Sequence, residues 1–345
     1  MLRTPLQARL CFTYRCNLRC PFCYERFARE SGSRKELPLS SWLSLLEELR
    51  GLGVFSVALI GGEPLCHPYM KPLLEDLTDG PMRFGVYTNG TLLDDMWVEL
   101  LQATHRCSHV TISLDGFEAY HDGIRGAGTF RRALAGIERV SAAGIPVKIA
   151  GVVSHDNYRA VPEFARFLET LPIREYKFTL RGDIAHGEDE LCEELSLEEN
   201  VEFFLSMERV RNELQKISPS SAPLTTLNQL RHPCPVTEIA PYCRSPLTTI
   251  SVLPDGSVPI CASYDESPVA GWIGKQRVID IWNGSVMNEF RQRQRCGKEL
   301  PREECGDCEY RQSCRKYCSK LEKFWFCYKE IADAMAKVEQ VVENN

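Results

Sequence analysis

Short apolar runs alternate with longer amphipathic segments along the first half of the chain, and this alternation restricts its fold more than any other feature. The runs are rich in Val, Ile, Phe or Tyr, as strands are; they are Ala8–Thr13, Val54–Ile60, Arg83–Tyr87, His109–Leu114, Val147–Val153 and Glu175–Leu180. The segments between them repeat apolar residues at helical spacing; they include Leu39–Leu52, Tyr69–Leu77, Asp94–Gln102, Thr129–Ala143 and Asn157–Thr170. This order predicts parallel βαβ units, which form a full or partial barrel or an open doubly wound sheet.

The residues with chemical character fall where these strands end. Cys16–Cys23 follows the first strand, Gly61–Pro64 the second, Thr88–Gly90 the third and Ser113–Gly116 the fourth. The carboxyl ends of parallel strands carry the active site both in barrels and in open sheets. We therefore expect the functional site at that edge.

Cysteine is the unusual part of the composition. The chain has 16 cysteines among 345 residues, whereas a disulfide scaffold needs about 8–10% cysteine. The first residues, Met1–Gln7, lack the apolar core of a secretion signal. We therefore expect a cytoplasmic protein, and because disulfides are rare there, metal or cluster ligation is the leading explanation for the cysteines.

The charge balance and the hydropathy exclude two classes of partner. The chain has 41 Lys and Arg against 47 Asp and Glu, a net charge of −6, so it lacks the basic excess of a nucleic-acid-binding protein. No apolar run approaches the roughly 18 residues that a membrane helix needs. We expect neither nucleic acid nor a membrane as a partner.

Three cysteines near the start have the spacing CxxxCxxC, at Cys16, Cys20 and Cys23. Three thiolates on one loop can hold a four-iron cluster and leave one iron open for a substrate or cofactor. The alternative is a structural zinc loop, but zinc usually takes a fourth protein ligand, and no fourth ligand is obvious nearby in the sequence.

This motif, with an aromatic residue just before its last cysteine, resembles the radical S-adenosylmethionine (radical SAM) superfamily. The resemblance covers Ala8 to about Leu180 and continues in order through Gly61-Gly62-Glu63-Pro64, Thr88-Asn89-Gly90 and Ser113-Leu114-Asp115-Gly116. It implies a [4Fe-4S] cluster bound by three cysteines, and S-adenosylmethionine that is cleaved to a 5′-deoxyadenosyl radical.

The resemblance also implies contacts to S-adenosylmethionine. Glu63 would meet the methionine ammonium group and Arg125 the methionine carboxylate, while Phe22 would lie near the adenine. The full set of implied cofactor-binding residues is Phe22, Gly62, Glu63, Thr88, Ser113 and Arg125. Three of these matches have a plainer alternative: Gly61–Pro64 could be a turn after a strand, Ser113–Gly116 a helix cap, and Arg125 a solvated surface charge.

A second cysteine array lies near the end of the chain. Its members are Cys243, Cys261, Cys305, Cys308, Cys314, Cys318 and Cys327. Their spacing resembles the SPASM extension of radical SAM enzymes, whose members carry two auxiliary [4Fe-4S] clusters. The alternative is a zinc site made by Cys305, Cys308, Cys314 and Cys318, which leaves the spacing of Cys243 and Cys261 unexplained.

The resemblance implies an interleaved ligand set. Cys305, Cys308, Cys314 and Cys327 would hold the outer cluster. Cys243, Cys261 and Cys318 would hold the inner one, with Cys234 as its candidate fourth ligand. An open iron at the inner cluster remains the alternative, and Cys296 could also serve.

Three regions follow from these patterns. We expect a radical SAM core at 1–181, a helical bridge at 182–232 and a SPASM domain with a terminal helix at 233–345. The fold class is α/β, a partial (β/α)6 barrel with a cysteine-rich extension. A hairpin is expected at Thr249–Ile260, and helices at Leu197–Ile217 and Lys316–Val342.

Radical SAM enzymes with this extension largely modify peptides and proteins, so the resemblance implies an oxidative peptide maturase that forms a crosslink or thioether or decarboxylates its substrate. The alternatives are a formylglycine maturase of sulfatases, a small-molecule dehydrogenase, or a zinc-bound protein without radical chemistry. In the formylglycine branch an Asp follows the cysteine corresponding to Cys261, whereas here Ala262 follows it.

The expected partners are a peptide or protein substrate and a reductant such as flavodoxin or ferredoxin. Because the cysteine loop begins at Cys16, no peptide-recognition domain is expected before it, and a separate recognition protein or direct leader binding would be needed. Cys66 is expected near the active site, where a thiol could donate a hydrogen atom. No catalytic base or hydrogen donor is assigned.

Overall fold

The structure of the protein is a computed structural model, which describes residues 2–23, 35–78, 80–181, 195–218, 221, 245–261, 267–296, 307–308, 317–318, 323–324 and 328–343.

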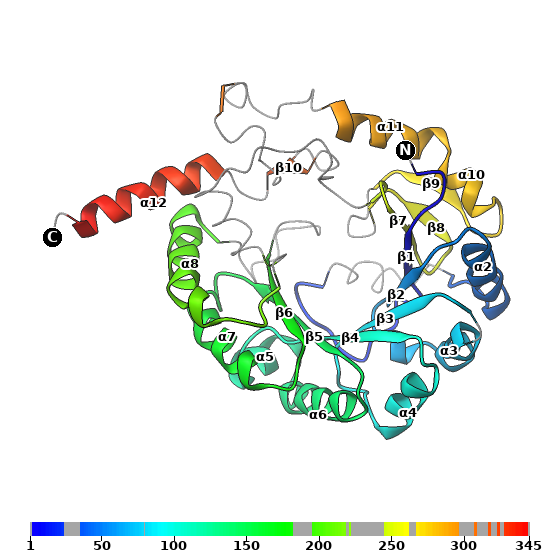
Figure 1. Cartoon of the computed structure of the whole chain (residues 1–345), viewed down its shortest axis with the longest axis horizontal. Helices are drawn as coiled ribbons and strands as arrows, with labels where there is room; N and C mark the ends of the chain where they lie inside the picture. Colours follow the sequence, from blue (N-terminus) through cyan, green and yellow to red (C-terminus); the bar gives the residue numbers. More distant parts are fainter. Residues whose placement is uncertain are drawn as a thin grey trace.

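A curved parallel sheet of seven strands forms the centre of the molecule (Figure 1). Its spatial order is β6-β5-β4-β3-β2-β1-β7, and every neighbouring pair is parallel. The strands are β1 (Gln7–Cys11), β2 (Ser56–Ile60), β3 (Arg83–Thr88), β4 (Cys107–Ser113), β5 (Val147–Val153), β6 (Glu175–Leu180) and β7 (Thr249–Val252). The predicted α/β class and the six predicted strands are confirmed.

Helices cover the outer side of this curve (Figure 1). They are α2 (Leu39–Gly51), α3 (Met70–Thr78), α4 (Asp95–Ala103), α5 (Glu118–Arg125), α6 (Thr129–Ala142), α7 (Val161–Thr170) and α8 (Leu197–Val210). Five match the predicted segments to within a few residues. The short α5 was not predicted, because Gly123 in its interior lowers helix propensity.

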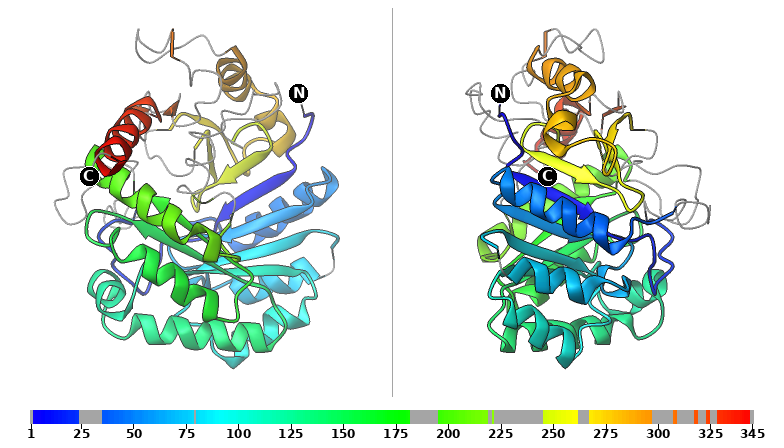
Figure 2. Two further views of the ribbon diagram at one scale, coloured as in Figure 1. Left: turned by 60° about the vertical axis from the view of Figure 1, so that its left-hand side comes forward. Right: turned by 90° about the vertical axis from the view of Figure 1, so that its right-hand side faces the viewer.

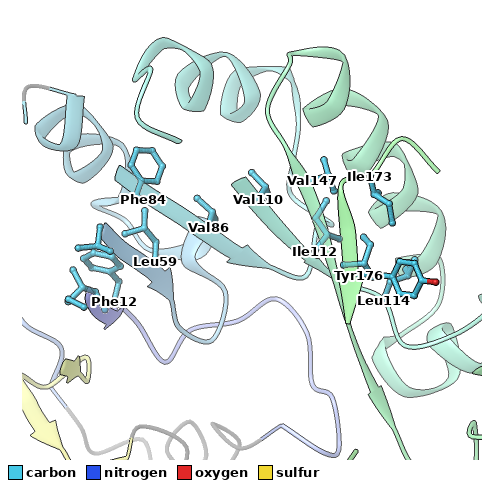
Figure 3. Close-up of a cluster of buried hydrophobic side chains, with 14 of the residues drawn as sticks. Phe12, Leu59, Phe84, Val86, Val110, Ile112, Leu114, Val147, Ile173 and Tyr176 are labelled. Carbon is cyan, nitrogen blue, oxygen red and sulfur yellow. The ribbon is translucent and has the colours of Figure 1, made fainter. Parts of the chain in front are cut away.

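One face of the sheet packs against these helices and forms the core (Figure 3). Each of the first six strands contributes a side chain that is at most 1% exposed: Leu10, Leu59, Val86, Ile112, Ile149 and Phe178. Burial of one such side chain contributes about 1.5–3 kcal/mol. The core therefore holds the strand order rigidly and fixes where the loops at the carboxyl edge begin.

The seventh strand differs from the prediction. Thr249–Val252 was expected to pair with Ser257–Ile260 as a hairpin, but β7 instead extends the parallel sheet beside β1. The chain does turn at Gly256, where φ is +87°, and Leu253 N–H donates to Ser257 O at 2.9 Å. Strand β8 (Ser257–Pro259) then pairs antiparallel with β9 (Val269–Trp272).

The predicted helix after residue 196 is shorter than expected. A capping box starts α8, in which the Ser196 hydroxyl accepts from Glu199 N–H and the Glu199 carboxylate accepts from Ser196 N–H. The helix ends at Val210 and a single 3-10 turn, Arg211–Glu213, follows.

The described C-terminal elements are α10 (Val278–Trp282), α11 (Ser285–Cys296), β10 (Tyr317–Cys318), β11 (Lys323–Phe324) and α12 (Tyr328–Glu343). The expected helix at Lys316–Val342 is therefore wrong over its first part, because β10 and β11 pair antiparallel there. Both views in Figure 2 show α10 and α11 at one end of the molecule and α4 and α6 at the other. No described helix is both long and apolar enough to cross a membrane.

Candidate functional site: a cysteine loop at the carboxyl edge of the sheet

The loop with Cys16, Cys20 and Cys23 begins just after β1 and is anchored to the end of β2. Gly62 N–H donates to Thr13 O and Glu63 N–H donates to Arg15 O, both at 2.8 Å. A Cβ atom on Gly62 would lie 2.4 Å from Arg15 O, closer than any side chain permits. Gly62 is therefore required so that the two backbones can approach.

A second set of contacts ties the loop to the end of β3. Asn89 donates from Nδ2 to Asn17 Oδ1, and Asn17 donates from Nδ2 to Thr91 Oγ1, each at 2.8 Å. Asn89 Oδ1 in turn accepts from the Thr91 hydroxyl at 2.6 Å. The amide of Asn17, inside the cysteine motif, is thus fixed by two residues that follow β3, about seventy positions later in the chain.

The three thiols lie in a shared environment at this edge. Cys20 is buried, whereas Cys16 and Cys23 are half-buried. Burial raises the pKa of the Cys20 thiol to about 11, an effect that the nearby Arg125 cation opposes and that Cys23, Asp115 and Cys16 reinforce. Within the described part of the chain, no three His, Cys, Asp or Glu side chains form a group that could hold a single metal ion.

Glu63 is a completely buried carboxylate between the ends of β2 and β3. Its Oε1 accepts from the Thr88 hydroxyl at 2.8 Å and from Leu65 N–H at 3.2 Å, and its Oε2 accepts from Asn89 N–H at 2.8 Å. Burial raises its pKa to about 7, although these three donors favour the ionised form. Glu63 and Thr88 are therefore direct partners.

Arg125 ends α5 and turns back toward the cysteine loop. Its side chain is only 10% exposed, and it donates from Nε and Nη2 to the two carboxylate oxygens of Asp115. Its guanidinium carbon lies 5.3 Å from the centre of the Phe22 ring. The interpretation of Arg125 as a solvated surface charge is wrong.

Asp115 is supported by residues that sequence analysis did not single out. Its backbone N–H donates to His121 Nδ1 at 3.3 Å, and Asn157 donates from Nδ2 to its carbonyl oxygen at 2.9 Å. Burial lowers the pKa of His121 to about 4, so this imidazole is neutral near pH 7 and accepts through Nδ1. No local motif marks His121 or Asn157 as partners of Asp115.

Ser113 is half-buried at the end of β4, and its hydroxyl has no hydrogen-bond partner among the described residues. Cys66 lies beside the cysteine loop, where the Asn17 backbone N–H partly offsets the rise in the pKa of its thiol. Burial raises the pKa of the Cys66 thiol, and the neighbouring Glu63 and Cys16 raise it further. The expectation that Cys66 lies near this site is confirmed.

Little of the second cysteine array falls within the described residues. Cys261 follows β8 and is half-buried, as is Cys308. Cys318 belongs to β10 and Cys296 ends α11. The predicted ligands outside the described residues are Cys234, Cys243, Cys305, Cys314 and Cys327.

Two known protein families match separate parts of this chain. The sequence model of the radical SAM superfamily matches residues 10–168, the part of the chain that contains the whole carboxyl-edge site. Residues 10–168 belong to the radical SAM superfamily. A second model, described as the SPASM iron–sulfur cluster-binding domain, matches residues 243–309.

Three curated relatives have related sequences. The chain is 31% identical to Fe-coproporphyrin III synthase of Methanosarcina barkeri over 60% of its own length and 52% of the relative's. It is 25% identical to the subtilosin biosynthesis protein AlbA of Bacillus subtilis, over 84% of its own length and 62% of AlbA. It is 28% identical to the mycofactocin maturase MftC of Mycobacterium ulcerans, over 92% of its own length and 85% of MftC.

The fold also matches solved structures. The crystal structure of Streptococcus suis SuiB bound to S-adenosylmethionine superposes with a TM-score of 0.74 at 17% identity, covering 95% of this chain and 78% of SuiB. The chain, with its seven-stranded parallel sheet, therefore shares its fold with SuiB.

The residues at the carboxyl edge fit the cofactors of this superfamily. A radical SAM domain binds a [4Fe-4S] cluster together with S-adenosylmethionine, and a SPASM domain binds auxiliary iron–sulfur clusters. The loop offers three thiols, and the Arg125 guanidinium lies within electrostatic range of Cys20 and Cys23. A fixed cation there favours thiolates and an anionic cluster.

Proposed function

We propose that this chain is a radical SAM enzyme that oxidatively modifies a peptide or protein. The observation that carries the proposal is the convergence of the cysteine loop, Glu63 and the Arg125–Asp115 pair at one edge of the sheet. When bound, the cofactors supply a 5′-deoxyadenosyl radical from S-adenosylmethionine and an acceptor for the electron that the oxidised substrate releases.

The chain's own residues bind and orient these groups. Cys16, Cys20 and Cys23 would hold the cluster that leaves one iron open. Arg125 has donors left over after its two bonds to Asp115, so it can also bind the methionine carboxylate, and the Ser113 hydroxyl can add a second donor.

The remaining cofactor-binding residues have simple roles. Glu63 would accept from the methionine ammonium group while Thr88 holds its carboxylate in place. Gly62 lets the cysteine loop lie close against the end of β2, beside the cofactor. Phe22 offers an aromatic surface for adenine.

The share of the chain that is similar to each relative favours a peptide substrate. The matches to AlbA and MftC cover 84% and 92% of the chain, so both extend beyond residues 10–168 of the radical SAM model. Fe-coproporphyrin III synthase matches only 60%. The similarity over most of the chain is therefore to a bacteriocin biosynthesis protein and to a mycofactocin maturase. The proposed product is a peptide with a crosslink, a thioether or a decarboxylated residue.

The second cysteine array serves as redox machinery in this proposal. Seven array cysteines and Cys234 make eight thiolates, enough for two four-cysteine clusters. Zinc in their place could not accept an electron, because it has no accessible second oxidation state. A flavodoxin or ferredoxin would supply electrons, and the reaction would take place in the cytoplasm. The peptide would reach the site through a separate recognition protein or by direct binding of its leader to this chain.

Metal analysis and product analysis test the proposal. Anaerobically reconstituted protein should contain close to twelve irons per chain, and the Cys16→Ala/Cys20→Ala/Cys23→Ala variant about eight. The variant should no longer form 5′-deoxyadenosine. Full cleavage by the variant, or zinc in place of iron, would contradict the proposal.

The mass of the product separates the substrate classes. A candidate precursor peptide should lose mass by oxidation or decarboxylation, whereas a formylglycine maturase converts a Cys or Ser residue to an aldehyde. Modification of a porphyrin or another small molecule, and not of peptides, would exclude the maturase reading.

A further inference from the structure

The charged residues of the seven-stranded sheet all lie on one face. Its strands contain five charged side chains: Arg9, Arg83, Lys148, Glu175 and Lys177. Four are cations, whereas the chain as a whole has a net charge of −6. The charged side chains of the sheet are therefore net positive, although the chain as a whole is net negative.

The strand register establishes that they share a face, because directly paired residues in a parallel sheet point to the same side. Arg9 pairs with Ala58, Ala58 with Gly85 and Gly85 with His109. Two residues further along β4, Thr111 pairs with Lys148, which pairs with Glu175. Arg83 is two residues before Gly85 and Lys177 is two residues after Glu175, so their side chains point to the same face. We call this side of the sheet the basic face.

The basic face is the concave side of the sheet. The alternate residues, such as Leu59 and Val86, pack under the helices on the convex side (Figure 3). The helices lie outside the curve in Figure 1, so the basic face is turned inward. Arg83 and Lys177 are nevertheless exposed, and Arg9 and Lys148 are half-buried.

Two of these cations, Arg9 and Arg83, lack a counter-charge within the described part of the chain. Lys148 pairs with Glu175 at 2.9 Å, the single carboxylate on the face. Burial lowers the pKa of His109 to about 4, with a further contribution from Lys148, so this imidazole adds no charge near pH 7.

The basic face continues to the carboxyl-edge site through Tyr87. This side chain is 39% exposed, directly precedes Thr88, and packs edge-on against His109 with ring centres 5.9 Å apart. This exposed phenol ring lies on the same face of the sheet as the cations. It can therefore pack against a peptide whose carboxylates the cations bind.

We propose that the basic face binds an acidic segment of the peptide substrate and places the adjoining residues at the carboxyl-edge site. This rests on the proposed function. The overall charge of −6 disfavours nucleic acids, whose charge extends along their whole length. A short peptide with a few carboxylates would be attracted locally without facing the acidic remainder of the surface.

Binding can be measured without turnover. The probes are two fluorescein-labelled peptides. One contains several Glu residues, and the other differs from it only in having Gln at those positions. Fluorescence anisotropy is recorded with reconstituted holoprotein and S-adenosylmethionine, and without reductant. The Glu peptide should bind about tenfold more tightly, and this preference should diminish as salt is raised because the face is exposed.

Matched variants locate the preference. Arg9→Gln/Arg83→Gln should remove most of it, whereas Lys71→Gln/Arg209→Gln, which removes two exposed cations from α3 and α8, should retain it. Both double variants change the net charge equally. Equal affinity of the wild-type protein for both peptides would overturn the proposal, and this comparison needs no variant to fold. Equal loss in both double variants would also overturn it.

The outcome is separable from that of the proposed function. If 5′-deoxyadenosine forms and the peptides bind equally, only the basic-face proposal fails. If no S-adenosylmethionine is cleaved under any condition, the proposed function fails, whatever the peptides do.

Discussion

Arg125 and Asp115 form a buried two-point ion pair, with Nε to Oδ2 at 2.5 Å and Nη2 to Oδ1 at 3.2 Å. Asp115 follows β4 and Arg125 ends α5, so the pair connects a strand end to the helix after it. Burial alone would lower the pKa of the guanidinium, but Asp115 raises it above its ordinary value. Arg125 is thus a permanently charged group aimed at the cysteine loop.

The first prediction concerns cofactor affinity. Arg125→Ala should weaken S-adenosylmethionine binding by about tenfold or more, because a charge-assisted hydrogen bond contributes roughly 1.5–3 kcal/mol. Equilibrium dialysis with reconstituted protein measures this. Arg131→Ala is the control, since Arg131 is 78% exposed on α6. An unchanged dissociation constant for Arg125→Ala would remove Arg125 from the proposed site.

The second prediction separates the pair's effect on stability from that on binding. Asp115→Asn should destabilise the protein by about 2–4 kcal/mol, because it leaves a buried cation without its counter-charge. In an Arg125→Ala background the same change should cost much less. Thermal midpoints of the four proteins give this coupling, and additive losses would mean that the two residues act independently.

The third prediction uses two glycines with opposite surroundings. Gly62→Ala should abolish cluster loading, because the new Cβ would lie 2.4 Å from Arg15 O and push the cysteine loop away. Gly123→Ala in α5 meets nothing within 4 Å and should stabilise the protein by about 0.5–1 kcal/mol. Iron content and thermal midpoints test both, and normal iron in Gly62→Ala would contradict the described loop packing.

The fourth prediction concerns retention of the cluster. Asn17→Ala removes both side-chain links from the cysteine motif to Asn89 and Thr91. Iron should then be lost to a chelator several times faster than from the wild-type protein. The control is Asn283→Ala, which removes an exposed asparagine bonded to Arg3 O in another part of the molecule. Equal rates in the two variants would show that these links do not hold the loop.

The fifth prediction is a pH dependence. The pKa of Glu63 is raised from 4.5 to about 7, so the folded protein binds its proton more tightly than the unfolded chain does. Its contribution to stability is present below about pH 4.5 and is lost as the pH rises to about 7, an effect on the order of 3 kcal/mol.

Comparison with Glu63→Gln isolates this effect. The thermal midpoint of the wild-type protein should fall relative to that of the variant between pH 4.5 and 7, because Gln does not titrate. A constant difference across this range would mean that Glu63 is ionised throughout.

The sequence alone determined the six alternating strands and the order of the motifs. Strands such as Val147–Val153 carry their own apolar pattern, and residues 39–52 carry a helical one, so neither requires a distant contact to be recognised. The motifs at Cys16, Gly62 and Ser113 could be placed at one edge, because parallel strands bring their carboxyl ends together.

Only the tertiary structure decided which of those residues touch. The pairing of Asp115 with Arg125, the anchoring of Asn17 by Asn89 and the addition of Thr249–Val252 beside β1 depend on how elements distant in sequence pack. The basic face likewise becomes visible only when the register aligns Arg9 with His109 and Lys148 with Glu175. Local patterns report the preference of a segment, whereas these contacts arise from the packing of a whole core, which no single segment encodes.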